Sequence, residues 1–476
     1  DLAPAYDPVT GTAVWNFDSG VANQYNIPAA DTLELVYEVQ ADAGLGTGLT
    51  LTNNAQVQFY YSFDNDAVPA NGVATGVREI YGPSNIAQVV LDTLPAPALL
   101  KTNPTDLDVS IGETFTYQIT VPGVTQATAL YDVRILDNLI ASAADLQFVS
   151  VTKVTGSQPW VPVNIGTVTD DLVIADVTNG IDIPANEQAI INVTVTLRDS
   201  NPPNVAGLLF NNSATYTFNR VDNDVATQAN GSGVTTVNMR VVEPELTLDK
   251  RGPAGTVNFS APIAYTLVAE NIGTGPAFDT TIVDQLPDVP DNPPLTGGTC
   301  NTAPVNFNAR ITSSADESAV LRALVPGTDY TATHTAAPTC ELVITTITDA
   351  ARIEAGEKLI VSYDVSLDPA SQSGASLTNI AGATRWFSLD TAGAGATGEI
   401  REYTRTITNG TTTLVDHEDA FNVIVDAPVL DVQKTVVNMT TGQNPGSNAS
   451  PGDVLRYTIT VNNGGIIDAT GVTVSD

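Results

Sequence analysis

The segment 191–197 reads Ile-Asn-Val-Thr-Val-Thr-Leu, so that apolar and polar side chains alternate at every position. Successive side chains of a β-strand point to opposite faces, and this alternation therefore predicts a strand with one face in a core. Segments 117–121 and 457–461 read Tyr-Gln-Ile-Thr-Val and Tyr-Thr-Ile-Thr-Val and show the same pattern. Turns rich in Gly, Asn, Asp and Pro separate such segments, and no long helical period is found. The sequence predicts an all-β protein built of tandem Ig-like β-sandwiches in an elongated array.

Length and charge narrow the functional classes. The chain has 476 residues, enough for several domains, and 42% of them are hydrophobic, which is too many for a disordered acidic chain. Its 53 acidic and 18 basic residues give a formal net charge of -35. Such a surface repels phosphate backbones and anionic membranes, so nucleic-acid binding is excluded. No window approaches the ~18 consecutive apolar residues of a membrane helix, so no membrane span is predicted.

An internal repeat is the strongest signal in the sequence. Segments 95–101, 244–250 and 428–434 share one pattern, in which a Pro is followed six residues later by a Lys, and each begins a repeat. A Tyr in an alternating strand follows each Lys, and an Asp follows each Tyr at nearly equal spacing. In chain order these residues are Lys101, Tyr117 and Asp137; Lys250, Tyr265 and Asp284; and Lys434, Tyr457 and Asp476.

The second half of the repeat recurs as well. A Leu/Phe-x-Asn-x-Ala element appears at 51–55, 210–214 and 377–381, with its Asn at Asn53, Asn212 and Asn379. The order of these elements predicts two complete sandwiches, 96–243 and 244–427. It also predicts a C-terminal half-repeat at 1–95 and an N-terminal half-repeat at 428–476.

Two interpretations of the half-repeats are open. In the first, the sequence is an excerpt of a longer, quasi-linear repeat array. In the second, the half that carries Lys434 and Asp476 completes the Asn53 half of another copy, head to tail. The expected partners are accordingly neighbouring repeats of a longer chain or copies of this one.

A candidate for chemistry comes from the lysines. The chain has five, and Lys101, Lys250 and Lys434 occupy the same repeat position. In a sandwich core, burial favours a neutral amine and a neutral acid. The protonated Asp could polarise the Asn carboxamide, and the amine could then attack, expel ammonia and leave a Lys–Asn amide. This reaction is a single turnover on the protein itself, and no other enzymatic constellation is found, so we do not expect an enzyme.

At these positions the sequence resembles the isopeptide-forming domains of fimbrial (pilin-type) and other prokaryotic surface proteins, together with a related cell-surface repeat family. The resemblance rests on Gly112-Glu113 before Tyr117, Gly452-Asp453 before Tyr457, Asn271-Ile272-Gly273 after Tyr265, and Asp284-Gln285-Leu286-Pro287. Two departures are Ala261-Pro262-Ile263 before Tyr265, and Ile140 in place of a Pro.

The resemblance implies two isopeptide crosslinks. Lys101 would join Asn212 with the help of Asp137, and Lys250 would join Asn379 with the help of Asp284. Lys434, Asp476 and Asn53 would need a neighbouring repeat. The alternative is structural: the Lys caps a linker strand, the Asp begins a turn and the Asn satisfies backbone groups at a bulge.

Cys300 and Cys340 are the chain's two cysteines, and both lie in a segment that is longer than its counterpart in the first complete repeat. A local disulfide that pins this insertion is expected, which implies an oxidising, extracellular location.

Two acidic triplets stand at equivalent repeat positions. Asp64 and Asp66 flank Asn65, and Asp222 and Asp224 flank Asn223. Clustered carboxylates could hold calcium between domains, although such triplets also form turns by hydrogen-bonding to their own backbone. No other cofactor is expected.

Together these features predict an extracellular structural protein that forms a stalk, fibre, filament or sheath at a prokaryotic cell surface. The alternative is a surface adhesin that binds a glycan or protein through variable loops, above all the insertion at 285–358, because binding residues often lie on loops that a rigid scaffold positions.

Overall fold

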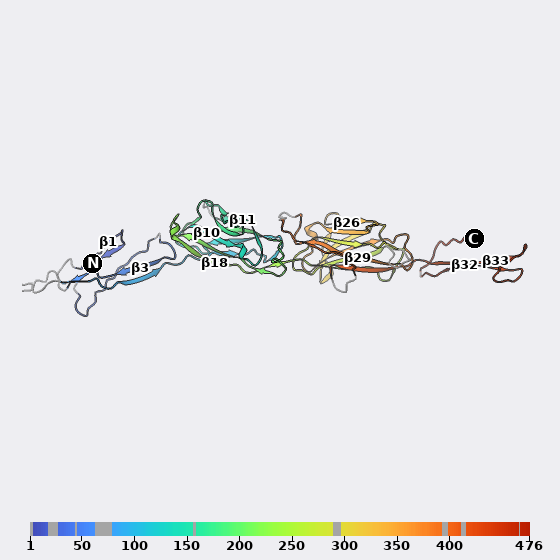
Figure 1. Cartoon of the computed structure of the whole chain (residues 1–476), viewed down its shortest axis with the longest axis horizontal. Coiled ribbons are helices and arrows are strands. Elements are labelled where there is room, and N and C mark those ends of the chain that lie inside the picture. The colour runs from blue at the N-terminus through green and yellow to red at the C-terminus, as the bar shows by residue number, and fades with distance from the viewer. Residues whose placement is uncertain are drawn as a thin grey trace, which may run out of the picture.

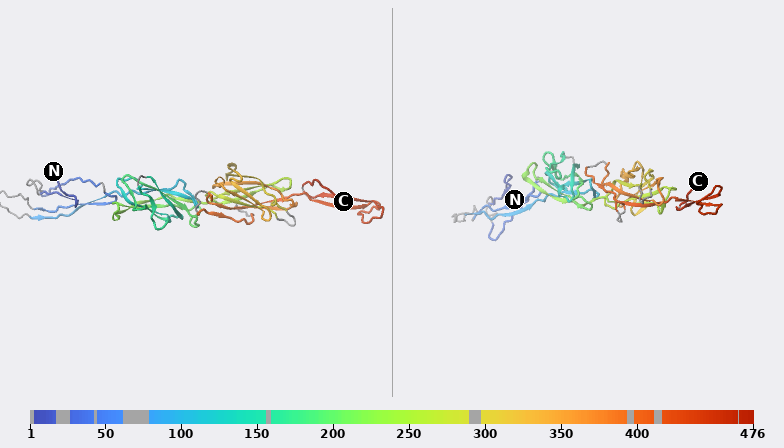
Figure 2. Two further views of the ribbon diagram at one scale, coloured as in Figure 1. Left: turned by 90° about the horizontal axis from the view of Figure 1, so that it is seen from above. Right: turned by 45° about the vertical axis from the view of Figure 1, so that its right-hand side comes forward.

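The computed structural model describes residues 3–17, 27–42, 45–61, 79–155, 159–288, 297–392, 398–410, 416–465 and 467–476. The described chain is elongated (Figure 1). An N-terminal segment, two β-sandwiches and a C-terminal hairpin follow one another along the long axis, and the views in Figure 2 agree on this order.

The first sandwich, roughly residues 96–243, has two principal sheets. One sheet has the strand order β12 (Pro162–Asn164), β13 (Asp171–Asp176), β10 (Leu130–Asn138), β17 (Ser213–Asn219) and β18 (Gln228–Thr235), with β14 (Ile181–Ile183) also paired to β10. The other has the order β11 (Leu146–Thr155), β15 (Ala189–Leu197), β9 (Thr114–Val121) and β7 (Leu100–Thr102). A small sheet of β16 (Leu209–Phe210), β19 (Met239–Val242) and β8 (Asp108–Ser110), and the 3-10 turns η1 (Leu139–Ala141) and η2 (Val225–Thr227), complete it.

The second sandwich, roughly residues 244–427, repeats this plan with a longer middle. Its first sheet has the order β20 (Leu246–Arg251), β22 (Ile263–Asn271), β28 (Glu357–Val365), β24 (Val305–Ser313) and β25 (Asp316–Leu324). Its second has the order β21 (Thr256–Val257), β31 (Glu418–Val425), β29 (Ser376–Phe387), β23 (Phe278–Gln285), β27 (Glu341–Thr346) and β26 (Tyr330–Thr335), with β30 (Glu402–Thr404) on β29. The turn η3 (Asp349–Ala351) precedes β28.

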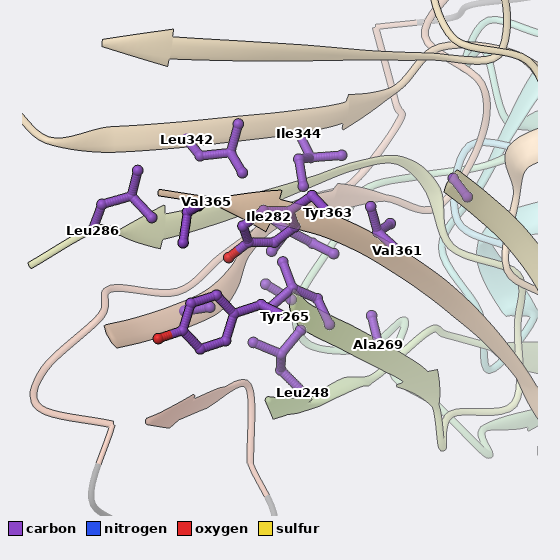
Figure 3. Close-up of a cluster of buried hydrophobic side chains, with 14 of the residues drawn as sticks. Leu248, Tyr265, Ala269, Ile282, Leu286, Leu342, Ile344, Val361, Tyr363 and Val365 are labelled. Atoms are coloured by element: carbon purple, nitrogen blue, oxygen red, sulfur yellow. The ribbon is translucent and has the colours of Figure 1, made fainter. Parts of the chain in front are cut away.

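The alternation of side chains explains these strands. Along β15, Ile191, Val193 and Val195 are fully buried, whereas the Asn and Thr residues between them are half-buried. One buried cluster runs from Ala96 to Val241 and a separate one from Leu246 to Val425. Figure 3 shows part of the second core. The all-β sandwich class predicted from the sequence is therefore confirmed.

The two terminal parts are open pairs of strands. The N-terminal segment has β1 (Ala5–Asp7) with β2 (Thr12–Val14), β3 (Thr50–Ala55) with β6 (Ala87–Asp92), and β4 (Tyr60–Tyr61) with β5 (Ile80–Tyr81). The C-terminal hairpin is β32 (Leu430–Asn438) with β33 (Leu455–Asn463). Apolar side chains in these parts, such as Val36, Leu91 and Val432, are more than half exposed. Among the described residues of these parts, no second sheet covers them as one does in the two sandwiches.

Among the described residues, the structure contains no helix that is long and apolar enough to span a membrane.

Candidate crosslinking sites

The first candidate site brings together Lys101, Asp137 and Asn212 in the core of the first sandwich. The Lys101 Nζ donates to Asp137 Oδ2 at 2.7 Å, and the Asn212 Nδ2 donates to Asp137 Oδ1 at 2.8 Å. The Lys101 and Asp137 side chains are inaccessible to solvent, and Asn212 is 1% exposed. One buried carboxylate thus holds the amine and the carboxamide, one on each oxygen.

Strand register produces this arrangement. Lys101 on β7 lies opposite Ile119 on β9, two residues beyond Tyr117, and the Tyr117 ring lies 4.6 Å from the Lys101 Nζ. In the other sheet, Asp137 on β10 lies opposite Ala214 on β17, two residues beyond Asn212. Because strand side chains alternate with a period of two, these offsets put the three polar side chains on the inward face of each sheet.

The second site repeats the register. Lys250 on β20 lies opposite Leu267, two residues beyond Tyr265, and Asp284 on β23 lies opposite Ala381, two residues beyond Asn379. The Lys250 Nζ donates to Asp284 Oδ2 at 2.6 Å and lies 4.7 Å from the Tyr265 ring centre. The site is fully buried between the two sheets.

Tyr363 distinguishes the second site from the first. Its hydroxyl donates to Asp284 Oδ2, and Lys250 Nζ donates to that hydroxyl at 3.2 Å. Tyr363 on β28 lies opposite Tyr265 on β22, and Figure 3 shows both rings within the core. In the first sandwich the corresponding cross-strand partner of Tyr117 is Val193, which has no hydroxyl.

Burial sets the charge state of the two amines. Removal from water lowers the pKa of Lys101, and the neighbouring Asp137 opposes this by charge and hydrogen bond. Burial likewise lowers the pKa of Lys250, against the effect of Asp284. In both sandwiches the neutral, nucleophilic form of the amine is therefore easier to reach than in water.

Several buried polar atoms at these sites lack hydrogen-bond partners. They include Asn212 Oδ1 in the first site and Asp284 Oδ1 in the second. The Asn379 carboxamide lies near the hydroxyls of Tyr265 and Tyr363, but neither of its polar atoms makes a hydrogen bond of normal geometry. Buried polar atoms without partners are rare in proteins, so their gathering at both sites calls for an explanation.

The half-repeats carry the matching parts of such a site. Lys434 on β32 lies opposite Ile459, two residues beyond Tyr457, and its Nζ lies 4.7 Å from the Tyr457 ring and hydrogen-bonds Asp476. Its side chain is 46% exposed. At the other end, the exposed Asn53 on β3 donates to the Tyr37 hydroxyl at 3.1 Å. The contacts of Lys434 with Tyr457 and Asp476 thus repeat those of the Lys in the complete sandwiches, whereas Asn53 contacts a Tyr and no Asp.

The sequence analysis missed the role of the second Tyr. Tyr37 and Tyr363 both stand 16 residues before the Asn of their repeat, at Asn53 and Asn379. This spacing was a usable signal, but only the cross-strand pairing of Tyr363 with Tyr265 brings its hydroxyl to the Lys and the Asp.

Cys300 and Cys340 form a disulfide with Cα atoms 5.2 Å apart, the pairing that the sequence predicts. The bond links the segment before β24 to the start of β27, in the middle of the insertion. Both cysteines are buried in the core of the second sandwich.

Of the two acidic triplets, the one that contains Asp222 and Asp224 lies within the described residues. Asp64 and Asp66 lie outside the described residues. Asp224 does not join a ligand cluster, because its Oδ1 caps η2 by accepting from the Ala226 N–H at 3.0 Å. Asp222 instead lies beside Asp132 and Asp182, two residues that local sequence patterns did not indicate.

A joint between the two sandwiches was also not foreseen. Arg401, 6% exposed, leaves the second sandwich and donates to Asp199 Oδ1 at 2.6 Å, and to the Asn204 carbonyl and Glu243 Oε2 at 3.0 Å each. Nearby, the Ser388 hydroxyl donates to the Ile111 carbonyl at 2.7 Å. Several hydrogen bonds from one buried guanidinium restrict rotation between the sandwiches.

Comparison with known proteins identifies structural likenesses only. No protein-family model and no curated protein matches this chain. The solved structures that match include bacterial surface and pilin-type proteins and a cohesin module of a Clostridium perfringens glycoside hydrolase.

Three of these show the level of similarity. The C-terminal domain of the antigen I/II-family protein AspA of Streptococcus pyogenes is 12% identical, with 60% of this chain and 95% of that one covered and a TM-score of 0.29. The full-length major pilin SpaD of Corynebacterium diphtheriae is 12% identical, with 72% and 68% covered and a TM-score of 0.23. BcpA, the major pilin subunit of Bacillus cereus, is 10% identical, with 77% and 84% covered and a TM-score of 0.25. Values this low describe a resemblance and assign no function.

Proposed function

We propose that this chain is a load-bearing structural segment of an extracellular prokaryotic surface fibre, stalk or sheath, whose sandwiches are locked by self-made Lys–Asn isopeptide bonds. The observation that carries the proposal is the shared carboxylate of Asp137. Its two oxygens hold Lys101 and Asn212 at 2.7 and 2.8 Å in a core closed to water.

The proposed reaction balances without a cofactor. The Lys101 Nζ bonds to the Asn212 Cγ, the Cγ–Nδ2 bond breaks, and a proton from Nζ leaves with Nδ2 as ammonia. Asp137 contacts both nitrogens and can pass this proton between them. Lys250, Asp284 and Asn379 are proposed to react in the same way, and each site reacts once.

The product would also resolve the unpaired atoms. A protonated Asp can donate from one oxygen to the carbonyl of the new amide and accept the amide N–H on the other. Asn212 Oδ1 and Asp284 Oδ1, which have no partner now, would then each have one. The buried sites are thus easier to explain as precursors of a bond than as ordinary packing.

The position of the proposed bonds would allow each sandwich to resist a pulling force. Lys101 is on the first sheet strand of its repeat, whereas Asn212 directly precedes β17 in the facing sheet. A covalent link between them closes most of the sandwich into one loop and holds the two sheets together. Arg401 adds a rigid joint between successive sandwiches, which favours transmission of force along the array rather than bending.

The half-repeats extend the proposal to assembly. Lys434 with Asp476 and Asn53 with Tyr37 are complementary parts of one site. We propose that each is completed by a neighbouring repeat, either of a longer chain or of a second copy. Denaturing electrophoresis of concentrated protein separates these cases, because crosslinking between copies gives a covalent ladder that a Lys434→Ala variant lacks.

The decisive experiment for the crosslinks is the intact mass of the reduced, denatured chain. Two internal bonds lower the mass by two ammonia molecules relative to the sequence. A Lys101→Ala variant should lose one of these deficits and Lys153→Ala, whose Lys lies outside both triads, should lose neither. An unshifted wild-type mass would contradict isopeptide formation and leave a noncovalent array.

The adhesin hypothesis remains a prediction. Much of the insertion at 285–358 forms strands of the two sheets, β24 to β27. Binding of the purified chain to a glycan array would support an adhesive role in addition to the structural one.

A further inference from the structure

One sheet of the first sandwich presents an outer face without ionic side chains. Its strands are β7, β9, β15 and β11, and none of them contains an Asp, Glu or Arg. Of the two lysines in these strands, Lys101 lies in the core. Lys153 lies opposite Ile191, which faces inward, and its Nζ lies 4.3 Å from the Trp160 ring. A neutral face of this kind contrasts with a chain that has 53 acidic residues and a formal net charge of -35.

Cross-strand pairing arranges the outward side chains of this sheet in rows. Read from the β7 side to the β11 side, the rows are Leu100, Thr120 and Ile190; Thr102, Gln118, Asn192 and Thr152; Thr116, Thr194 and Ser150; and Thr114, Thr196 and Gln147. We call these residues the neutral face. All of them carry a hydroxyl, a carboxamide or an aliphatic group.

Many polar groups of the neutral face are already hydrogen-bonded to one another across the strands. The pairs are Thr114 with Thr196 at 2.9 Å, Thr116 with Thr194 at 3.1 Å, and Gln118 with Asn192 at 3.3 Å. A polar group that keeps a hydrogen-bond partner loses little when water is removed from it. The face can therefore be covered at a low cost in desolvation.

The neutral face is open in the described chain. Thr102, Thr114, Gln118 and Thr152 are exposed, and Leu100 is 48% exposed. The centre of a protein interface differs from the remaining surface chiefly in its depletion of charged residues. The neutral face has this composition, although nothing in the described chain packs on these exposed residues.

The second sandwich shows that the fold does not require neutrality here. Counted from the site Lys and from the cross-strand partner of the Tyr, Asp249, Arg251 and Asp364 stand where the first sandwich has Leu100, Thr102 and Thr194. Arg251 forms an ion pair with Glu317 at 2.6 Å, and both side chains are partly exposed. The same sheet position thus accepts charges in one sandwich and lacks them in the other.

We propose that the neutral face is the surface through which two copies of this chain associate side by side, first sandwich against first sandwich. Over the rest of the surface the surplus of carboxylates makes two copies repel each other. A partner that is itself acidic therefore approaches best where no carboxylate stands, and a second copy is such a partner. A two-fold axis places the face opposite itself.

This contact goes beyond the proposed crosslinks, which lie inside each sandwich, and does not depend on them. Four strands about 4.8 Å apart and about eight residues long present roughly 500 Å² per copy. Two such faces bury roughly 1,000 Å², which is the size of a weak interface. In a fibre or sheath many such contacts act together, so that weak pairs hold long chains side by side.

The test is analytical ultracentrifugation of the full chain at about 0.15 M salt, where exposed charges are screened beyond about 8 Å. The weight-average mass of the wild type should rise from one chain towards two as its concentration increases to about 1 mM, a range that reaches weak interfaces. Thr194→Asp and Leu100→Asp should each weaken this association at least about tenfold, because each places like charges on both copies in the contact. The second sandwich carries Asp at both equivalent positions, so these variants should fold.

Two controls locate the contact. Thr215→Asp adds the same charge to an exposed position of β17 in the other sheet of the first sandwich, and it should associate as the wild type does. Lys434→Ala alters the C-terminal half-repeat and should also associate normally, which separates this contact from head-to-tail joining.

A wild-type chain that stays single at the highest concentration would overturn the proposal. Unchanged association in both Thr194→Asp and Leu100→Asp would do the same, because it would place the contact on another surface. Binding of a neutral glycan to this face by a chain that stays single would replace the second copy as its partner. The intact mass, which tests the crosslinks, is independent of all three results.

Discussion

Asn212 donates its hydrogen bond to Asp137 from a position two residues before the point where the two strands pair directly. The same offset recurs between Asn379 and Asp284, although the strands around them differ in length. Each triad is thus determined by the register of two sheets, and its chemistry can be tested one residue at a time.

Replacing Asn212 with Ala should remove one ammonia deficit from the intact mass and leave the Lys101–Asp137 pair in place. Without the crosslink, a loop of roughly 100 residues is unrestricted in the unfolded state. The free energy of unfolding of the first sandwich should therefore fall by about 4 to 5 kcal/mol. Mass spectrometry and urea unfolding measure the two effects. Asn211→Ala, one residue earlier, should retain both deficits.

An Asn379→Ala variant should become more stable as the pH rises towards 10.5, the ordinary pKa of a lysine amine. Its Lys250 stays free, and burial lowers the pKa of this amine from 10.5. In that window the unfolded chain binds more protons than the folded chain, so the free energy of unfolding increases with pH. The measurement is chemical unfolding at a series of pH values.

The control for this pH effect is the double variant Asn379→Ala, Lys250→Met, which lacks the titrating amine. Buried tyrosines with raised pKa act in both variants and cancel in the comparison. Equal pH slopes in the single and double variants would contradict the assignment to Lys250.

Replacing Tyr363 with Phe should weaken the second sandwich without preventing its crosslink. The change removes a hydroxyl that contacts Lys250 and Asp284, at a cost of about 1 to 3 kcal/mol. The first site is arranged with Val193 at this position, so the ammonia deficit should stay at two. Tyr265→Phe, whose hydroxyl has no hydrogen-bond partner, should change stability much less. Loss of one deficit in Tyr363→Phe would instead make the hydroxyl part of the reaction.

Replacing Arg401 with Ala should loosen the joint between the sandwiches and leave each of them folded. Asp199 and Glu243 lose their shared cation, and the Asn204 carbonyl loses a donor. Small-angle scattering should show a broader distribution of end-to-end distances. Arg385→Ala, which removes an exposed ion pair with Glu402, is the control and should scatter as the wild type does.

Replacing both Cys300 and Cys340 with Ser should destabilise the second sandwich by about 2 to 4 kcal/mol, because the unfolded chain regains the freedom that the loop restricts. A reducing agent should have the same effect on the wild type. Thermal unfolding followed by calorimetry tests this, and an unchanged transition of the second sandwich would show that the bond adds nothing to its stability.

Local alternation was enough to predict strands such as β9, β15 and β33, because a period of two is a property of the strand itself. The internal repeat showed in addition that Lys, Asp and Asn occupy equivalent positions in successive repeats. When strands pair in one register throughout a repeat family, equal spacing in sequence becomes equal placement in space, which is why Lys101, Asp137 and Asn212 could be named together.

Sequence alone determined the all-β class, the repeat and the residue types of each triad, because all three follow from residue patterns over short stretches of the chain. Only the tertiary structure decided that Tyr363 reaches Lys250, that Arg401 joins two sandwiches, and that Asp222 meets Asp132 and Asp182 rather than Asp224. The physical reason is the same in each case. These contacts join residues on different strands or different domains, so they depend on how the sheets fold over each other and not on any spacing along the chain.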